Sequence, residues 1–477
     1  MQLTYSYFAI ALYLAVCIGI LIYTLRQTGF RLALGGLQRE SVGSQQYGWL
    51  LVAITVSVTM LGPADALGLS GKGYEYGLIW ALAPMGAAIA QVIAGLFFVH
   101  RIKSYPGANQ TLGDILSGKF GISVRPAVGF IVTLQAVAFA GVLVLAGAQI
   151  LEVFLGVPKV WGLVLTALPI GLFTAVGGLS AVVKMDVFQG ILMFVALMFV
   201  AGVAVVVSTE SVQWDAPLPL ETGAFQTEVG YYALFTAFLT YLFGEFLLPI
   251  YSQRALIART QRDARIGFVG AVIIAGIWYL IIAFAGVVAF IVAEGVSDPE
   301  FVLIDNLKTL LGDTGPLISI AVAIALVSLF ALLHSTFDGI LNAGGVSFSK
   351  DLVSSFVPLN DTEQATLARR AMFAFAVLGL ILPFRWPDMI ELLLIGYTIW
   401  APTVMPILVY TLLTDAKPVD KRIFWFAFGA GIAGWITGQY LIPQGFIPAI
   451  LIGVALNALV LLAAHARLAK PKPMSVK

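Results

Sequence analysis

The chain has 477 residues, of which 60% are hydrophobic and only 11% are charged, and its formal net charge is +1. About a quarter of the residues of a soluble domain are charged, so this composition excludes a soluble fold, whose surface would lack polar cover. The balanced charge gives no case for nucleic-acid binding. A single cysteine, Cys17, excludes an intrachain disulfide and a cysteine-rich metal site.

Apolar segments of roughly 20 residues, the length that crosses a bilayer, recur along the whole chain. The first, 5–25, has no positive residue before it, so we interpret it as a retained membrane helix rather than a signal peptide. Twelve more follow: 48–70, 77–99, 126–155, 160–177, 181–208, 229–251, 266–293, 315–346, 371–386, 388–413, 423–442 and 446–464. We therefore predict an all-α integral protein of the cell membrane with about 13 transmembrane helices.

The basic residues indicate how these helices are oriented. With the N-terminus outside, an odd number of spans places the C-terminus inside. In this topology 22 of the 26 lysines and arginines fall in inside segments, and the long outside loops 209–228 and 294–313 are acidic. An excess of lysine and arginine on the inner side is the rule for membrane proteins. The sequence thus predicts N-terminus outside and C-terminus inside.

Two of the predicted spans contain helix-breaking residues at mid-depth. If 48–70 is core helix 1, it holds Gly62-Pro63, and proline frees the carbonyl of Thr59. Core helix 6, 229–251, holds Gly244, Glu245 and Pro249. Broken helices five apart are typical of an inverted five-plus-five repeat with a central site, although glycine and proline are also ordinary in membrane helices. We expect four regions: an extra helix and inside loop (1–47), two five-helix repeats (48–208 and 209–414), and two peripheral helices with a basic tail (415–477).

Oxygen-bearing side chains lie within the predicted spans. Core helix 8, 315–346, carries the adjacent hydroxyls of Ser335 and Thr336, with Asp338 one turn further on. Acids inside a membrane helix are costly and are functional by default, and the same applies to Asp65, Asp186 and Glu245. We interpret His334 as a packed, neutral histidine. Carbonyls of a broken helix and hydroxyls of a facing one suit sodium, a hard cation that takes oxygen ligands.

Three stretches of the sequence resemble the sodium:solute symporter family, which includes sodium/sugar, sodium/proline and sodium/sialic acid carriers. The stretch 174–189, TAVGGLSAVVKMDVFQ, is similar to the family's GGLxAVxxTDxxQ signature, with Met185 in place of threonine. The stretch 335–342, STFDGILN, is similar to STxDSxLNS, with Gly339 in place of serine. The third, 249–254, is followed by a basic loop, as after the family's sixth core helix.

The resemblance implies a LeuT-like fold, alternating access and a sodium ion between core helices 1 and 8. By position, its ligands would be the carbonyls of Val58, Leu61 and Leu332 and the hydroxyls of Ser335 and Thr336. A second sodium site of some members would use Asp186, Ser335 and the positions of Asp338 and Gly339. Since one of those positions is a carboxylate here and the other has no side chain, we treat Asp186 and Asp338 as a second cation or proton site.

The expected solute site contains Asp65 past the first helix break, Glu245 in the second, Gln135 on core helix 3 and Tyr397 on core helix 10. Because no basic residue is expected beside the two acids, they favour an amine-bearing small solute. The rival interpretation is that one or both acids are protonated, or are satisfied by backbone amides at the helix break. We predict a sodium-coupled symporter, monomeric or weakly oligomeric, and not an enzyme. Two alternatives remain open: proton coupling through Asp186 and Asp338, and a transporter-like solute sensor.

Overall fold

The computed structural model of the chain describes residues 2–28, 47–106, 111–210, 228–292, 302, 316–387, 389–442 and 448–468. In these ranges all the regular elements are helices, which confirms the predicted all-α fold. The predicted outside loops 209–228 and 294–313 and the basic tail lie almost entirely outside the described residues. The four expected regions and the orientation of the helices in the membrane stay predictions.

Within the described ranges the helices follow one another along the chain without any intervening sheet. In the first half they are α1 (Gln2–Thr28), α4 (Trp49–Met60), α5 (Pro63–Tyr76), η1 (Leu78–Ala81), α6 (Leu82–Ile93), η2 (Ala94–Phe98), α7 (Val99–Ser104), α8 (Leu112–Phe120), η3 (Ile122–Val124), α9 (Arg125–Leu155) and α10 (Lys159–Glu210). In the second half they are α11 (Glu228–Gly244), α12 (Pro249–Ile257), α13 (Gln261–Val292), α15 (Pro316–Ser347), η5 (Phe348–Leu352), η6 (Val353–Ser355), α16 (Asp361–Gly379), α17 (Leu382–Arg385), α18 (Met389–Trp400), α19 (Met405–Leu413), α20 (Lys421–Tyr440) and α21 (Ala449–Leu468).

The helices match the predicted membrane spans. Among the described residues, eight helices are long and apolar enough to cross a membrane, and three bent pairs bring the number to as many as eleven. The two other predicted spans, 181–208 and 423–442, coincide with the second half of α10 and with α20. Within α10, Gly178 has a positive φ of 61°, which separates the predicted spans 160–177 and 181–208.

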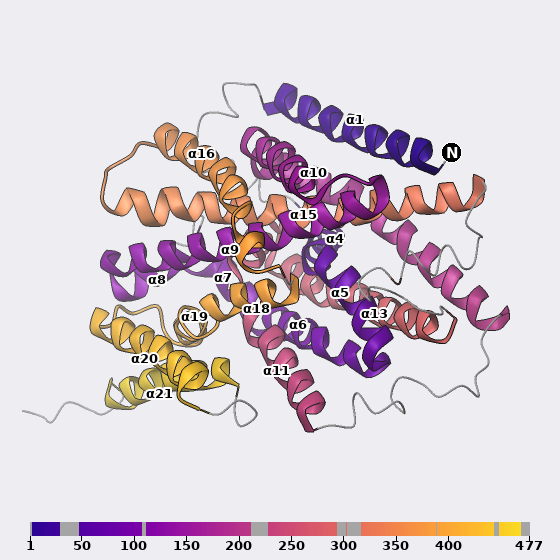
Figure 1. The fold of residues 1–477 in the computed structure, drawn as a ribbon. Coiled ribbons are helices and arrows are strands. Elements are labelled where there is room, and N and C mark those ends of the chain that lie inside the picture. Colours follow the sequence, from indigo (N-terminus) through magenta and orange to yellow (C-terminus); the bar gives the residue numbers. More distant parts are fainter. Residues whose placement is uncertain are drawn as a thin grey trace, which may run out of the picture.

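The long helices α9, α10 and α15 form the centre of the molecule, and the extra helices lie at its edges (Figure 1). α1 packs along α10 and α15 at one edge, and α20 and α21 pack against each other at the opposite edge. α1 leaves large apolar side chains exposed, such as Phe8 at 68% and Leu12 at 55%. An apolar helix with so little cover fits a position against lipid.

Three helix pairs are bent at short breaks. The pair α4–α5 is bent by 58° and the pair α11–α12 by 45°, at the glycines and prolines that the sequence singled out. The third pair, α18–α19, is bent by 41° around Pro402 and was expected as one continuous span. The carbonyls of Pro402 and Thr403 accept hydrogen bonds from Nδ2 of Asn457 on α21, both at 2.9 Å. A side chain from another helix thus replaces the amides that the break removes.

Gly431 on α20 lets this helix approach the α18–α19 break closely. A Cβ atom at Gly431 would overlap the carbonyl oxygen of Pro402 and lie 3.1 Å from Nδ2 of Asn457. Both neighbours belong to the hydrogen-bonded break, and one of them is backbone. Close contacts of this kind are common between membrane helices and need glycine.

We expect Gly431→Ala to lower the apparent melting temperature of the purified protein, because overpacking of this type costs about 1–3 kcal/mol. The measurement is a thermal scan in detergent that follows tryptophan fluorescence. Gly429→Ala on the same helix is the matched control, since a Cβ there meets nothing within 4 Å. Equal melting temperatures for the two variants would contradict the close approach.

Candidate functional site

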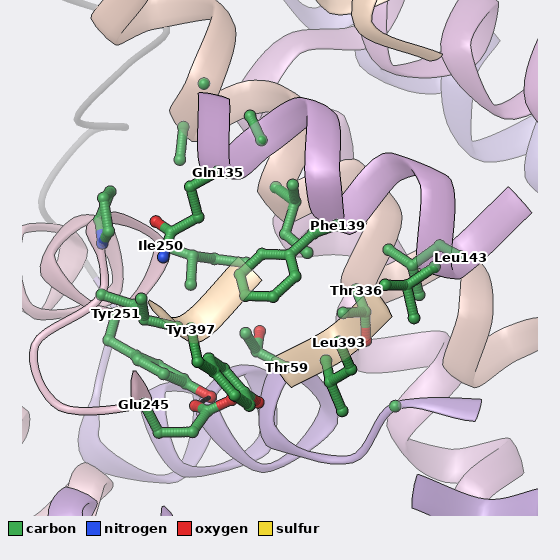
Figure 2. A pocket seen from close by; sticks show the side chains of 18 of the residues that line it. Thr59, Gln135, Phe139, Leu143, Glu245, Ile250, Tyr251, Thr336, Leu393 and Tyr397 are labelled. Atoms are coloured by element: carbon green, nitrogen blue, oxygen red, sulfur yellow. Dashed lines mark hydrogen bonds between the residues drawn. The ribbon is translucent and has the colours of Figure 1, made fainter. Parts of the chain in front are cut away.

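A cavity of about 60 Å³ lies between α9, α15, α18 and the breaks of α4–α5 and α11–α12 (Figure 2). This volume has room for several water molecules. All four predicted solute residues, Asp65, Gln135, Glu245 and Tyr397, line it, although they come from four different helix regions. Thr336, one of the predicted sodium ligands, lines it as well. The structure therefore brings the predicted solute residues and one predicted ion ligand to the same place.

Glu245 carries one of the two carboxylates of the cavity. It follows the end of α11, and its side chain is buried, with 7% exposed. The phenol hydroxyls of Tyr251 and Tyr397 both donate hydrogen bonds to it, and Figure 2 shows the two side chains converging on the carboxylate. Sequence reasoning missed Tyr251, although it lies two residues after Pro249, where α12 begins.

The backbone around Glu245 is held in an irregular conformation by side chains. Its carbonyl accepts a hydrogen bond of 3.2 Å from Nε2 of Gln91 on α6, and the carbonyl of Phe246 accepts one of 3.0 Å from Nε1 of Trp400 on α18. Leu247 has a φ of 55°, a region that non-glycine residues occupy only when their surroundings enforce it. The break is thus a built feature that positions Glu245.

Asp65 is the second acid of the cavity and the third residue of α5. Its carboxylate accepts hydrogen bonds from the hydroxyl of Tyr241 at 2.9 Å and from the amide of Gly62 at 3.2 Å. A carboxylate in the first turn of a helix is also favoured by the helix dipole. None of the described residues that line the cavity is basic, so neither Asp65 nor Glu245 has a cationic side chain beside it there.

Aromatic rings surround the two acids. The ring of Tyr397 lies 5.4 Å from that of Phe139 in an edge-to-face arrangement and 5.7 Å from that of Tyr241. Carboxylates combined with aromatic faces attract cationic groups, because the ring faces carry partial negative charge. Phe139 and Tyr241 were not singled out from the sequence, where nothing distinguishes them from other aromatic residues of apolar helices.

At the end of α4 the backbone amides that follow Leu61 no longer form helical hydrogen bonds. The amide of Leu61 still donates to the carbonyl of Ser57 at 3.0 Å. The next amide, that of Gly62, turns to the carboxylate of Asp65 instead. Pro63, which follows, has no N–H group. The hydrogen-bond ladder of α4 therefore stops at Leu61.

The consequence is a set of backbone carbonyls without their helical donors. In a continuous helix the amides of residues 62 and 63 would serve the carbonyls of Val58 and Thr59. Leu61 has an extended conformation, with φ −93° and ψ 92°. α15 packs against α4, and Leu332 on α15 is buried like Val58 and Leu61. The break thus leaves carbonyl oxygens of α4 without helical donors, on a helix that packs against α15.

The two hydroxyls predicted as sodium ligands have different surroundings. Ser335 donates its proton to Oδ1 of Asp186 at 2.6 Å, which leaves the lone pairs of its oxygen for other partners. Oγ1 of Thr336 is buried and has no hydrogen-bond partner among the described residues. A buried hydroxyl without a partner is uncommon and costs free energy unless a ligand or an ion satisfies it.

Asp186 and Asp338, predicted to share a cation or a proton, have separate partners. Oδ2 of Asp186 accepts from Thr55 and lies 3.1 Å from Nη2 of Arg254. Asp338 accepts from Thr174. Its other oxygen lies 3.2 Å from Nε2 of His334, without the alignment of a hydrogen bond. Sequence reasoning did not assign Arg254 to this cluster, because it lies 68 residues from Asp186.

His334 also links the core to α1. Its Nδ1 lies 2.9 Å from the hydroxyl of Tyr13, which accepts a hydrogen bond of 3.0 Å from Nε2 of Gln189. The imidazole ring packs edge-on against Phe173 at 4.8 Å. The extra N-terminal helix is therefore joined to α15 and α10 by buried polar contacts, in addition to its apolar ones.

Comparison with known protein families decides the identity of the fold. The sequence profile of the sodium:solute symporter family matches residues 41–417. The chain belongs to the sodium:solute symporter family. Its relatives include the sodium/pantothenate symporter of Escherichia coli K12, 30% identical over 190 residues, and sodium/proline symporter 2 of Staphylococcus saprophyticus, 23% identical over 207 residues. These alignments cover 38% and 42% of this chain, and 38% and 40% of the two relatives.

Solved structures share the fold of this family member over nearly its whole length. A Na+-coupled sialic acid symporter in a substrate-bound, outward-open state is similar with a TM-score of 0.77, at 15% identity and 99% coverage of both chains. A transporter of the nucleobase-cation-symport-1 family in a closed conformation has a TM-score of 0.60, at 14% identity, with 91% of this chain and 95% of the other covered. These likenesses confirm the predicted LeuT-like architecture.

Proposed function

We propose that this member of the sodium:solute symporter family is a sodium-coupled symporter of the cell membrane, which carries a small amine-bearing solute by alternating access. The observation that carries the proposal is the buried Thr336 hydroxyl, which has no hydrogen-bond partner within the part of the chain that the structure describes. It lines the acidic cavity together with Thr59 and Gly62 of the α4–α5 break. One residue thus combines an unsatisfied hard oxygen donor with a place in the wall of the acidic cavity.

The proposed sodium ligands are the carbonyls of Val58, Leu61 and Leu332 and the hydroxyls of Ser335 and Thr336. Neutral oxygens of this kind suit a monovalent hard cation. Asp186 orients the Ser335 hydroxyl by accepting its hydrogen bond. Polar groups within a membrane protein usually mark an ion or substrate path.

Sodium and solute binding would be coupled through the broken helix α4–α5. The residues of the break supply proposed sodium ligands on one side, and Thr59, Met60, Gly62 and Asp65 line the cavity on the other. An ion that fixes the geometry of the break also fixes this wall of the cavity. Each ligand then raises the affinity for the other by the same factor, as linkage requires.

The proposed solute class follows from the charges of the cavity. Asp65 and Glu245 lie among aromatic rings, and no described basic residue lines the cavity. A carboxylate-bearing solute without an amine, such as the pantothenate of one relative's name, would meet only like charge there. The proline in the name of another relative carries a positively charged nitrogen, and a group of that kind fits Glu245 and the ring of Tyr397.

A thermal-shift screen of the purified chain against a solute library, in sodium and in choline buffer, tests the proposal. A ligand that binds the folded state raises the melting temperature by mass action. We expect amine-bearing solutes to raise it, and to do so more strongly in sodium. Hits confined to sugars or to acids without an amine would contradict the solute class. Equal shifts in both buffers would contradict sodium coupling.

Transport should respond to voltage as well as to sodium. One sodium ion that enters through a potential of 100 mV releases about 2.3 kcal/mol, which corresponds to roughly 50-fold accumulation of a solute without net charge. We expect this accumulation in proteoliposomes with equal sodium on both sides and an imposed negative interior. Liposomes without the potential are the control. Binding without any accumulation would favour the sensor alternative.

A further inference from the structure

We propose that Arg254 is a built-in cation that neutralises Asp186, so that the chain binds one sodium ion and has no second sodium site at Asp186. The proposal rests on the sodium-coupled function proposed above and concerns its stoichiometry. It also accounts for Gly339, a position at which this chain departs from the family's STxDSxLNS pattern.

Arg254 and Asp186 form an ion pair within the protein. Nη2 of Arg254 lies 3.1 Å from Oδ2 of Asp186, and both side chains have no exposed surface. The guanidinium nitrogens Nε and Nη1 have no hydrogen-bond partner among the described residues. No described acid other than Asp186 forms an ion pair with Arg254, so its charge is balanced by this carboxylate.

The remaining contacts of Asp186 are hydrogen bonds from protein side chains to its two carboxylate oxygens. Ser335 donates to Oδ1 at 2.6 Å, and Thr55 donates to Oδ2. With the guanidinium, both carboxylate oxygens have donors from the protein. A buried carboxylate is stable when it is paired and hydrogen-bonded in this way, so Asp186 does not require a bound cation.

Gly339 provides the space that the guanidinium occupies. A Cβ atom at this position would lie 3.1 Å from Nη2 of Arg254 and 2.5 Å from Cδ1 of Ile250. A serine there, as in the family pattern, would collide with Ile250 and press on the guanidinium. The residue that removes a side-chain ligand from the expected second site therefore also makes room for the arginine.

Asp338, the other acid of the expected site, has partners of its own. It accepts a hydrogen bond from Thr174, and its second oxygen faces His334 at 3.2 Å. The charged and titratable groups that face Asp186 are Arg254, Tyr47 and Asp338. Those that face Asp338 are Asp186, His334 and Tyr13. The expected pairing of the two carboxylates around one ion does not fit these contacts.

A sodium ion placed at Asp186 would lie beside a charge of the same sign. The guanidinium remains protonated in proteins, so the repulsion cannot be relieved by loss of a proton. A lysine would keep the charge, whereas the shorter, uncharged glutamine would remove it and leave Asp186 with two hydroxyl donors. These substitutions separate the charge of residue 254 from its size.

The test is equilibrium binding of radioactive sodium to the purified full chain at pH 8, counted as ions per protein. We expect about one ion for the wild type, about one for Arg254→Lys, and about two for Arg254→Gln, because the released carboxylate and its hydroxyl donors form a new site. Arg259→Gln is the matched control, since Arg259 pairs with Asp263 and is 65% exposed. It should bind one ion.

Two ions on the wild type, or one ion on a folded Arg254→Gln chain, would overturn the inference and leave sodium coupling intact. No sodium on the wild type would instead refute the proposed function. If Arg254→Gln does not fold, the double variant Asp186→Asn with Arg254→Gln removes both charges together. One ion on the double variant supports the inference, and none overturns it, because the remaining site would then depend on this pair.

Discussion

Replacement of Ser335 and Thr336 together by alanine is expected to abolish sodium-dependent stabilisation and uptake. Each hydroxyl is a proposed ligand of the ion, and a hydrogen-bond-like contact to a charged group contributes about 1.5–3 kcal/mol. Loss of both should weaken sodium binding by a factor of about 100 or more. The measurement is the melting temperature as a function of sodium concentration, at constant ionic strength with choline.

The controls for this variant lie on the same helix. Ser328→Ala removes another buried hydroxyl of α15, one that lies outside the cavity, and should leave the sodium titration unchanged. Thr336→Ser retains a hydroxyl and should bind sodium much better than Thr336→Ala. A double-alanine variant that keeps the sodium response of the wild type would refute the assignment of both residues.

Glu245→Gln is expected to remove solute binding while sodium binding persists. If an amine occupies the cavity, truncation of its carboxylate partner should cost about 2–5 kcal/mol, which corresponds to a roughly 30-fold or greater loss of solute affinity. Glutamine keeps the size of the side chain and still accepts a hydrogen bond from Tyr251 or Tyr397. The affinity is measured with a solute that the thermal-shift screen identifies.

Glu152→Gln is the matched control, because Glu152 is exposed on α9 and does not line the cavity. It should bind solute and sodium as the wild type does. Tyr397→Phe, which removes one hydrogen bond to Glu245 but keeps the ring, should produce a smaller loss than Glu245→Gln. Full solute affinity in the Glu245→Gln variant would refute an amine-binding role for this carboxylate.

Local signals in the sequence were sufficient to predict the helices, two of the three breaks and the acids of the cavity. Apolar length determines a membrane helix, and Gly62-Pro63 and Pro249 act on their own backbone, so each prediction depends on neighbours in the chain. An acidic residue within an apolar span can also be recognised from the sequence alone, without knowledge of its contacts. For this reason Asp65 and Glu245 were found even though they lie on different halves of the fold.

The partners of these acids depend on tertiary packing and carried no local signal. Tyr241 reaches Asp65 across 176 residues, and Arg254 reaches Asp186 across 68. Many other tyrosines and arginines in the chain look the same in sequence. The break between α18 and α19 was missed for a related reason: its prolines were visible, but no acid or hydroxyl pattern distinguished it from an ordinary membrane helix with proline.

Asn457 gives the C-terminal helices a role beyond that of a peripheral addition. Its side chain satisfies the two carbonyls that the α18–α19 break leaves open, and α18 carries Tyr397 into the cavity. The α18–α19 break therefore depends on α21 for its hydrogen bonds. A shortened chain that ends before α21 would leave the carbonyls of Pro402 and Thr403 without these donors, next to the helix that carries Tyr397. Any fusion or shortened version should be joined beyond residue 468, where α21 ends.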